Sequence, residues 1–152
     1  MNVFINGLGN VSPQNTLDNE QFLTEIRNEN CTALWCIEPD YKSLLKGINL
    51  RRMSRLLKQA VYSAKLCMKD ADNTTLDAII TGTGLGFTED TEKFLTGIYK
   101  NNEGIISPTL FIQSTHNVVS AKIALLLNCQ NYNFTYASKG ASFESALLDG
   151  MM

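Results

Sequence analysis

Three stretches of the chain repeat apolar side chains every three or four positions, which is the spacing of an amphipathic helix. The longest is residues 50–70, where this spacing is followed by Met53, Leu56, Leu57, Ala60, Val61, Ala64, Cys67 and Met68. Residues 88–99 and a short segment at 21–28 follow the same spacing. Residues 114–127 are apolar or small on most of their surface, which predicts a buried helix, and residues 143–152 begin another.

Short runs rich in β-branched and aromatic residues lie at residues 3–7, 76–81 and 132–136 and predict strands, the first of them central. Glycines at 7 and 9 and at 82, 84 and 86 end the first two. Residues 30–47 have weaker periodicity and predict an ordered but irregular excursion. Because strands and helices alternate, the class is α/β, and the absence of repeats or linkers predicts one domain over residues 1–152.

Composition excludes several function classes. The 152 residues carry a formal charge of -2 and no basic block, so neither nucleic acid nor a membrane surface is an expected partner. No apolar run approaches the roughly 18–20 residues of a membrane span, and residues 1–9 lack the features of a signal peptide, so we expect a cytoplasmic protein. The four cysteines are scattered without metal-ligand spacing, so we expect reduced thiols and neither metal nor cofactor.

Three candidate sites have plain structural interpretations. The glycines of Gly82-x-Gly84-x-Gly86 complete neither a dinucleotide-binding nor a Walker A motif, so a tight turn is favoured. His116, the only histidine, is interpreted as a packed or capping residue rather than half of a Cys-His pair. Lys139 is interpreted as an exposed turn lysine rather than a Schiff-base former.

Residues 135–142 have the order of a nucleophile elbow, in which a strand enters a sharp turn that opens a helix. Its predicted apex is Gly140, which has no side chain. Ser138 and Ser142 flank the apex, but a hydroxyl nucleophile needs a general base, and the sequence does not supply one visibly.

Read as a whole, the segment order resembles the N-terminal half of the β-ketoacyl synthases, which have the thiolase fold. The resemblance is carried by residues 5–9 with Ser12-Pro13, the arginine-rich segment 51–55, the strand and glycine turn 78–86, and residues 106–108 with 117–121. It implies a mixed sheet of about five strands covered by helices. In an ungapped alignment from Asn117, Gly140 takes the place of the acyl-accepting cysteine, so no catalytic residue is expected.

A relative without this cysteine looks like a chain length factor, the non-catalytic partner of a ketosynthase in type II fatty-acid, polyketide or aryl-polyene-like biosynthesis. The resemblance then implies a homodimer or a heterodimer with a ketosynthase and indirect contact with acyl chains bound to acyl carrier protein. One alternative is a ketosynthase-type acyltransferase (3-oxoacyl-carrier-protein synthase) that uses Ser138 or Ser142 or a second half supplied elsewhere. Another is a structural module with no acyl role.

The same resemblance assigns three surfaces. Phe111, Ile112 and Gln113 are candidates for the end of an acyl tunnel, with local core packing as the equally weighted alternative. Tyr132, Phe134 and Tyr136 lie on the strand expected to pair across a dimer two-fold. An apolar helical face is expected to stay uncovered, with these candidates on residues 121–127: Ala121, Ile123, Ala124, Leu125, Leu126 and Leu127.

Overall fold

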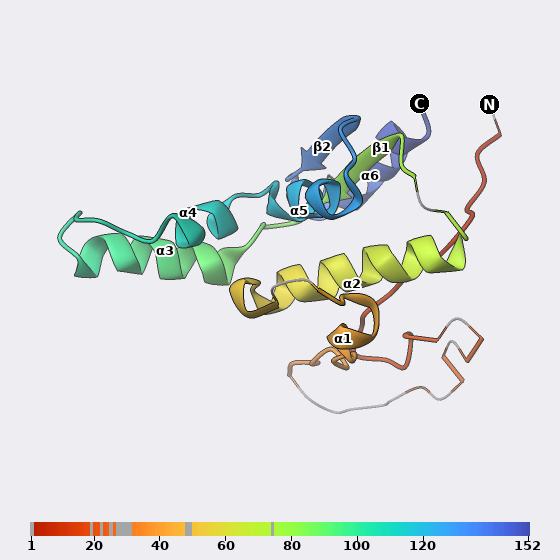
Figure 1. The fold of residues 1–152 in the computed structure, drawn as a ribbon, viewed down its shortest axis with the longest axis horizontal. Coiled ribbons are helices and arrows are strands. Elements are labelled where there is room, and N and C mark those ends of the chain that lie inside the picture. Colours follow the sequence, from red (N-terminus) through yellow and green to blue (C-terminus); the bar gives the residue numbers. More distant parts are fainter. Residues whose placement is uncertain are drawn as a thin grey trace. The chain divides into compact units, whose positions relative to one another are not determined.

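A computed structural model describes residues 2–18, 20–21, 23–24, 26, 32–47, 50–73 and 75–152 (Figure 1). The chain packs as two compact units, Met1–Thr74 and Thr75–Met152. Much of the predicted helix at residues 21–28 lies outside the described residues.

The first unit is organised by helix α2, Arg55–Asp70, which confirms the helix predicted from periodicity. The helix begins five residues later than predicted, because Leu50–Arg52 forms a separate 3-10 turn (η1) and Ser54 is the N-cap. The short helix α1, Tyr41–Leu44, packs on α2, and the Asp40 side chain accepts a hydrogen bond from the Lys42 N–H at its N-terminus. The core of this unit consists of Leu45, Met53, Leu57, Val61 and Tyr62.

The strand predicted at residues 3–7 is not formed. The segment contacts α2 instead, where the Cys67 thiol donates to the Gly7 carbonyl at 3.2 Å and the Leu8 N–H donates to an Asp70 carboxylate oxygen at 2.9 Å. A Cβ at Gly9 would lie 2.2 Å from the Ser63 carbonyl oxygen, so this glycine is required by close contact with a helix. The prediction was wrong because the backbone of the segment bonds to a helix rather than to another strand.

A polar cluster fixes the irregular segment before α1 to the start of α2. The Glu38 carboxylate accepts hydrogen bonds from Tyr41, Arg55 and, at 2.9 Å, the Gln59 amide. The Arg55 guanidinium also lies 5.2 Å from the centre of the Trp35 ring. Burial by itself raises the pKa of Glu38, but the hydrogen bonds from Tyr41 and Arg55 and the Arg55 charge outweigh it and hold that pKa below its ordinary value.

We therefore expect Glu38→Gln to lower the free energy of unfolding by about 0.5–1 kcal/mol at neutral pH. The value is small because the Arg55 and Glu38 side chains are 45% and 40% exposed and screened by water. A lowered native pKa stabilises the fold above the ordinary pKa of glutamate, about 4.3, and this contribution is lost as the pH falls through the native pKa. Urea unfolding at pH 7 and pH 3 should show the difference from the native chain only at pH 7. Glu92→Gln, an exposed position on α3 (Thr88–Lys100), is the control, and an unchanged difference at pH 3 would contradict this origin.

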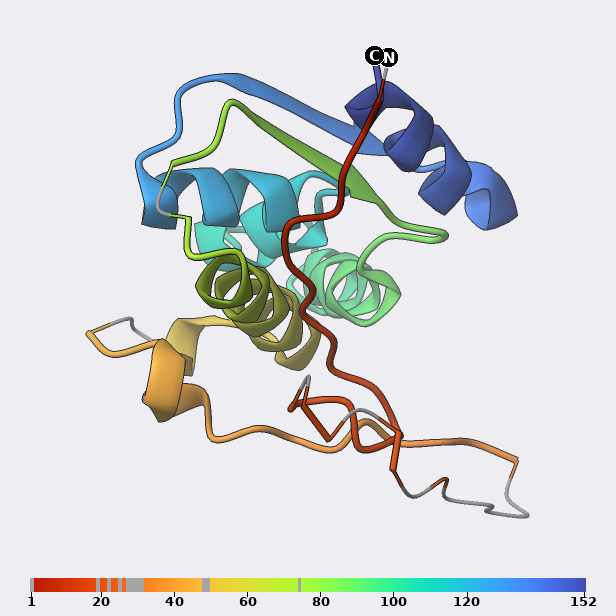
Figure 2. The same ribbon diagram turned by 90° about the vertical axis from the view of Figure 1, so that its right-hand side faces the viewer.

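The second unit is built on two parallel strands, β1 (Ala78–Gly82) and β2 (Tyr132–Tyr136), which pair from Ala78 with Tyr132 to Gly82 with Tyr136. Both were predicted from the sequence. Among the described residues the sheet has these two strands and not about five, so the expected strand number was wrong. The α/β class holds, because α5 (Val118–Leu127) and α6 (Ser142–Gly150) pack on the strands (Figure 2).

Alternate residues of β2 face the two helices. Tyr132 donates its hydroxyl hydrogen to Asp149 of α6 at 3.1 Å, whereas Asn133 and Thr135 bond to Ser120 of α5. Because successive side chains of a strand point to opposite faces, α5 and α6 cover opposite sides of the pair. Ser120 is fully buried, and its hydroxyl continues through Thr135 to Thr81 in a chain of hydrogen bonds that joins both strands to α5.

Two further helices, α3 and α4, follow β1 and precede α5 along the chain. Helix α3, Thr88–Lys100, was predicted, and α4, Pro108–Ser114, was not. The two pack together through Phe94 and Phe111, whose ring centres are 5.6 Å apart. Within the described part of the chain, no single helix is long and apolar enough to cross a membrane; α4 and α5 reach that length only together and are bent by 105° between them.

Candidate functional site

The elbow predicted at residues 135–142 is present at the carboxyl end of the parallel strands. Strand β2 ends at Tyr136, the 3-10 turn η2 covers Lys139–Ala141, and α6 begins at Ser142. The Thr83 N–H donates to the Tyr136 carbonyl at 2.8 Å, which fixes the end of β1 beside the elbow. The carboxyl edge of parallel strands is where ligands of α/β proteins generally bind, so the elbow is the leading candidate site.

The turn itself has its left-handed residue at Lys139, where φ is 53°. Among the glycines of the described residues, only Gly47 and Gly86 have positive φ, so Gly140 does not use the conformational freedom of glycine. A Cβ at Gly140 would meet no atom within 4 Å. Lys139 and Gly140 are both exposed.

Ser142 holds the elbow together and is buried, with 3% of its surface exposed. Its hydroxyl accepts from the Ser138 N–H at 2.8 Å and lies 2.8 Å from both the Thr83 and the Lys139 carbonyl oxygens, to which it can donate. All these partners are backbone groups, so the hydroxyl has no general base and no access to a substrate. Ser138 is exposed, and its side chain makes no capping hydrogen bond.

The glycine turn after β1 packs against the elbow, which sequence reasoning did not foresee. A Cβ at Gly82 would lie 2.4 Å from the Ser142 carbonyl oxygen, and one at Gly84 would lie 3.5 Å from the Lys139 carbonyl oxygen. Gly86, with φ of 68°, leaves room for His116, whose ring would lie 2.8 Å from a Cβ there. The sequence marked the glycines, His116 and the elbow separately, and only the fold brings them to one place.

The thiols do not replace the missing nucleophile within the second unit. Cys129 donates to the Leu76 carbonyl at 3.4 Å, just before β1 and therefore at the opposite end of the sheet from the elbow. Cys36, Cys67 and Cys129 are free thiols, and Cys31 lies outside the described residues. Burial, followed by the charge of Asp70, raises the pKa of Cys67, which disfavours its reactive thiolate. No group of three or more potential metal ligands occurs among the residues that the structure describes.

Strand β2 carries a row of aromatic side chains on the face toward α6. Tyr132 and Phe134 are about half exposed, and the rings of Phe134 and Tyr136 lie 4.9 Å apart. Desolvation and a hydrogen bond to Asp149 raise the pKa of Tyr132, so its hydroxyl stays protonated and continues to donate. In the described part of the chain, β2 pairs with β1 alone, so its other edge is free to pair.

The remaining surface candidates differ in exposure. Phe111 and Ile112 of α4 are each 57% exposed, and Gln113 is half-buried, so the first two do not fill a local core. The expected uncovered face on residues 121–127 is met only in part, because Leu125 is exposed, Ile123 is buried and the other candidates are half-buried. Helix α6 has exposed apolar side chains at Phe143, Leu147 and Leu148, with Met151 just beyond the helix.

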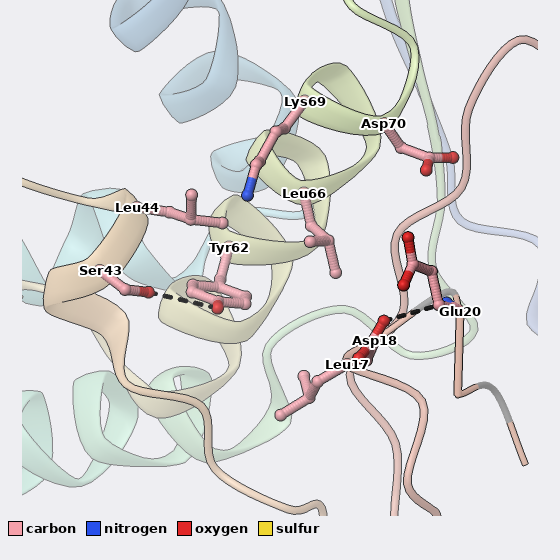
Figure 3. A pocket seen from close by; sticks show the side chains of 9 residues that line it. All are labelled: Leu17, Asp18, Glu20, Ser43, Leu44, Tyr62, Leu66, Lys69 and Asp70. Carbon is pink, nitrogen blue, oxygen red and sulfur yellow. Dashed lines mark hydrogen bonds between the residues drawn. The ribbon is translucent and has the colours of Figure 1, made fainter. Parts of the chain in front are cut away.

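The first unit contains an open cavity of about 640 Å³, lined by residues 17, 18 and 20 and by parts of α1 and α2 (Figure 3). Its lining residues are Leu17, Asp18, Glu20, Ser43, Leu44, Tyr62, Leu66, Lys69 and Asp70. Ser43 and Tyr62 share a hydrogen bond of 3.4 Å, and Asp18 accepts from the Glu20 N–H at 2.9 Å. The Ser43–Tyr62 bond joins α1 to α2, and the Asp70 carboxylate accepts from the Leu8 N–H, so these polar groups support the fold.

Comparisons with known proteins show which solved structures share this fold. No family model matches the sequence, and no curated protein matches it. Solved structures do match. The complex of a ketosynthase (ApeO) with its chain length factor (ApeC) from Xenorhabdus doucetiae aligns with a TM-score of 0.67 and 16% identity over 95% of this chain and 58% of the other.

Two further structures agree. The ishigamide ketosynthase/chain length factor aligns with a TM-score of 0.68 and 19% identity over 97% of this chain and 44% of that one. A β-ketoacyl synthase from Burkholderia phymatum STM815 aligns with a TM-score of 0.55 and 18% identity over 66% of this chain and 26% of that one. The chain thus spans 58% or less of the length of these neighbours. It has the fold of the ketosynthases and chain length factors, as the resemblance implied.

Proposed function

We propose that this chain acts as a non-catalytic, chain-length-factor-type subunit in type II fatty-acid, polyketide or aryl-polyene-like biosynthesis. The observation that carries the proposal is an intact strand-turn-helix elbow, in a ketosynthase-like fold, that presents no thiol. An acyl group passed through a condensing enzyme is held as a thioester on cysteine, and neither glycine nor a base-free serine performs this step. In this proposal the elbow has a structural role and does not accept an acyl group.

The proposal includes a ketosynthase as partner. The neighbouring structures from Xenorhabdus doucetiae and of the ishigamide system are complexes of a ketosynthase and a chain length factor. On this chain, the free edge of β2 and its row of Tyr132, Phe134 and Tyr136 offer backbone and aromatic groups to a second strand. Pairing across this edge, with a ketosynthase or with a second copy, would satisfy those backbone groups.

The proposed role in chain length places Phe111, Ile112 and Gln113 at the far end of the partner's acyl tunnel. Phe111 and Ile112 are available for this, because more than half of each is exposed in this chain. The Phe111 ring is held by Phe94 from the α3 side, which limits its movement. A carrier-protein-bound acyl chain would then contact this subunit without being bonded to it.

We expect co-expression with a cysteine-bearing ketosynthase from the same organism to yield a heterodimer, measured by size-exclusion chromatography with light scattering. In that pair, Phe111→Ala should shift the main product to longer acyl chains, because the end of the tunnel loses an aromatic ring. Ile105→Ala is the control, since Ile105 is 97% exposed on the loop before α4. A monomer that binds no ketosynthase, or an unchanged product length with Phe111→Ala, would contradict the proposal.

The isolated chain separates this role from the acyltransferase alternative. After incubation of the isolated chain with acyl-carrier-protein thioesters, peptide mass spectrometry should show no acyl ester at Ser138 or Ser142. An ester at Ser138, whose side chain is exposed, would instead favour a serine-dependent acyltransferase.

A further inference from the structure

The elbow contains a left-handed backbone conformation at Lys139, a residue type for which this conformation is unfavourable. Lys139 adopts φ of 53° although a glycine, which adopts positive φ without steric cost, is its immediate neighbour. Non-glycine residues held in this region concentrate at functional sites, where the surrounding structure fixes them. The glycine, Gly140, therefore follows the residue with the strained backbone, Lys139, by one position.

The surroundings of Lys139 fix its backbone and leave its side chain exposed. Its carbonyl oxygen lies 2.8 Å from the Ser142 hydroxyl. The same oxygen lies next to the Gly84 turn, where a Cβ added to Gly84 would be 3.5 Å from it. The side chain is exposed at the carboxyl end of β1 and β2. At Gly140, in contrast, neither the backbone angle nor the available space requires a glycine.

We propose that Lys139, and not Gly140, is the apex residue of the elbow and takes the position at which β-ketoacyl synthases carry the acyl-accepting cysteine. This assignment rests on the proposed ketosynthase-like function and makes its site more specific. It means that the chain presents an amine, rather than an absent side chain, at the position of the nucleophile. A cysteine placed at residue 139, and not at 140, would recover the family's arrangement.

The assignment is tested with Lys139→Cys and Gly140→Cys in the full chain, by following the rate of iodoacetamide alkylation against pH at each site with peptide mass spectrometry. A thiol at 139 lies at the first residue of η2, where backbone N–H groups favour the thiolate, whereas a Cβ at 140 meets no atom within 4 Å, so a thiol there stays in open solvent. We expect the thiol at 139 to titrate about one pH unit lower than the thiol at 140. Equal values, or a lower value at 140, would overturn the assignment.

A stability series supplies an independent measurement that needs no ketosynthase, so its result does not depend on the chain-length role. Lys139→Gly should have a Tm about 3 °C above that of Lys139→Ala, because only glycine relieves the left-handed conformation. Gly140→Ala should leave the Tm unchanged or slightly raised. A lower Tm for Gly140→Ala, with no difference between the two variants at 139, would place the strained residue at 140 and overturn the proposal.

Discussion

Gly82→Ala is expected to destabilise the second unit by about 1–3 kcal/mol, the usual cost of forcing an extra methyl group into a packed site. The new Cβ would lie 2.4 Å from the Ser142 carbonyl oxygen and 2.8 Å from its carbonyl carbon. Both atoms belong to the backbone at the start of α6, so relief requires the end of β1 to move away from the helix. The effect should appear as a lower midpoint in urea unfolding and as increased hydrogen exchange at Thr83 and Ser138.

Gly140→Ala is the matched control for this experiment, because it makes the same change a few residues from the contact and its Cβ would meet nothing within 4 Å. It should change the free energy of unfolding by less than about 0.5 kcal/mol. If both variants were equally destabilised, the loss would come from the general rigidity of the elbow and not from the contact between Gly82 and α6.

Ser142→Ala is expected to cost about 1–3 kcal/mol, because it removes a buried hydroxyl and leaves partly buried backbone groups without their hydrogen-bond partner. The hydroxyl accepts from the Ser138 N–H and donates toward Thr83 or Lys139, and the side chain is 3% exposed. Chemical denaturation followed by circular dichroism measures the loss. The loss should be the same with and without an acyl thioester, since the serine acts on the fold and not on a substrate.

Ser145→Ala provides the comparison, because Ser145 lies on the same helix and its hydroxyl donates to the Ala141 carbonyl at 2.7 Å near solvent. Water can replace that bond, so the change should stay within about 0.5 kcal/mol. A stability of Ser142→Ala equal to that of Ser145→Ala would show that the elbow does not depend on the buried hydroxyl.

The elements that the sequence predicted correctly are those whose signal is local. Helix α2 was visible because its apolar positions follow the helical period over four turns, and β1 and β2 were visible because short β-rich runs end at turn residues. Helix α4 was missed because seven residues are too few for a clear period. Its start was nevertheless marked by Ser107 followed by Pro108, a common beginning of a helix.

Residues 3–7 show where local signals mislead. Their composition suits a strand, but a strand exists only if its backbone groups bond to another strand, and here the segment contacts α2 through Gly7 and Leu8. The expected number of strands failed for the same reason, since the pairing of distant segments is a tertiary property. The uncovered apolar face was likewise assigned to α5 from composition, whereas packing on the strands buries Ile123 and leaves the apolar side chains of α6 exposed.

The sequence by itself determined the α/β class, the main helix, the two paired strands, the elbow between β2 and α6 and the absence of a cysteine there. Tertiary structure decided what each elbow residue does, because these roles depend on groups far apart in the chain. The buried Ser142 hydroxyl stabilises the elbow because the Thr83 carbonyl, 59 residues away in sequence, lies within hydrogen-bond distance. Glycine is required at position 82 because the backbone of α6 lies against it. Lys139, and not Gly140, has the left-handed backbone conformation, because its carbonyl group is held between the Ser142 hydroxyl and the Gly84 turn. These contacts form only when the two strands pair.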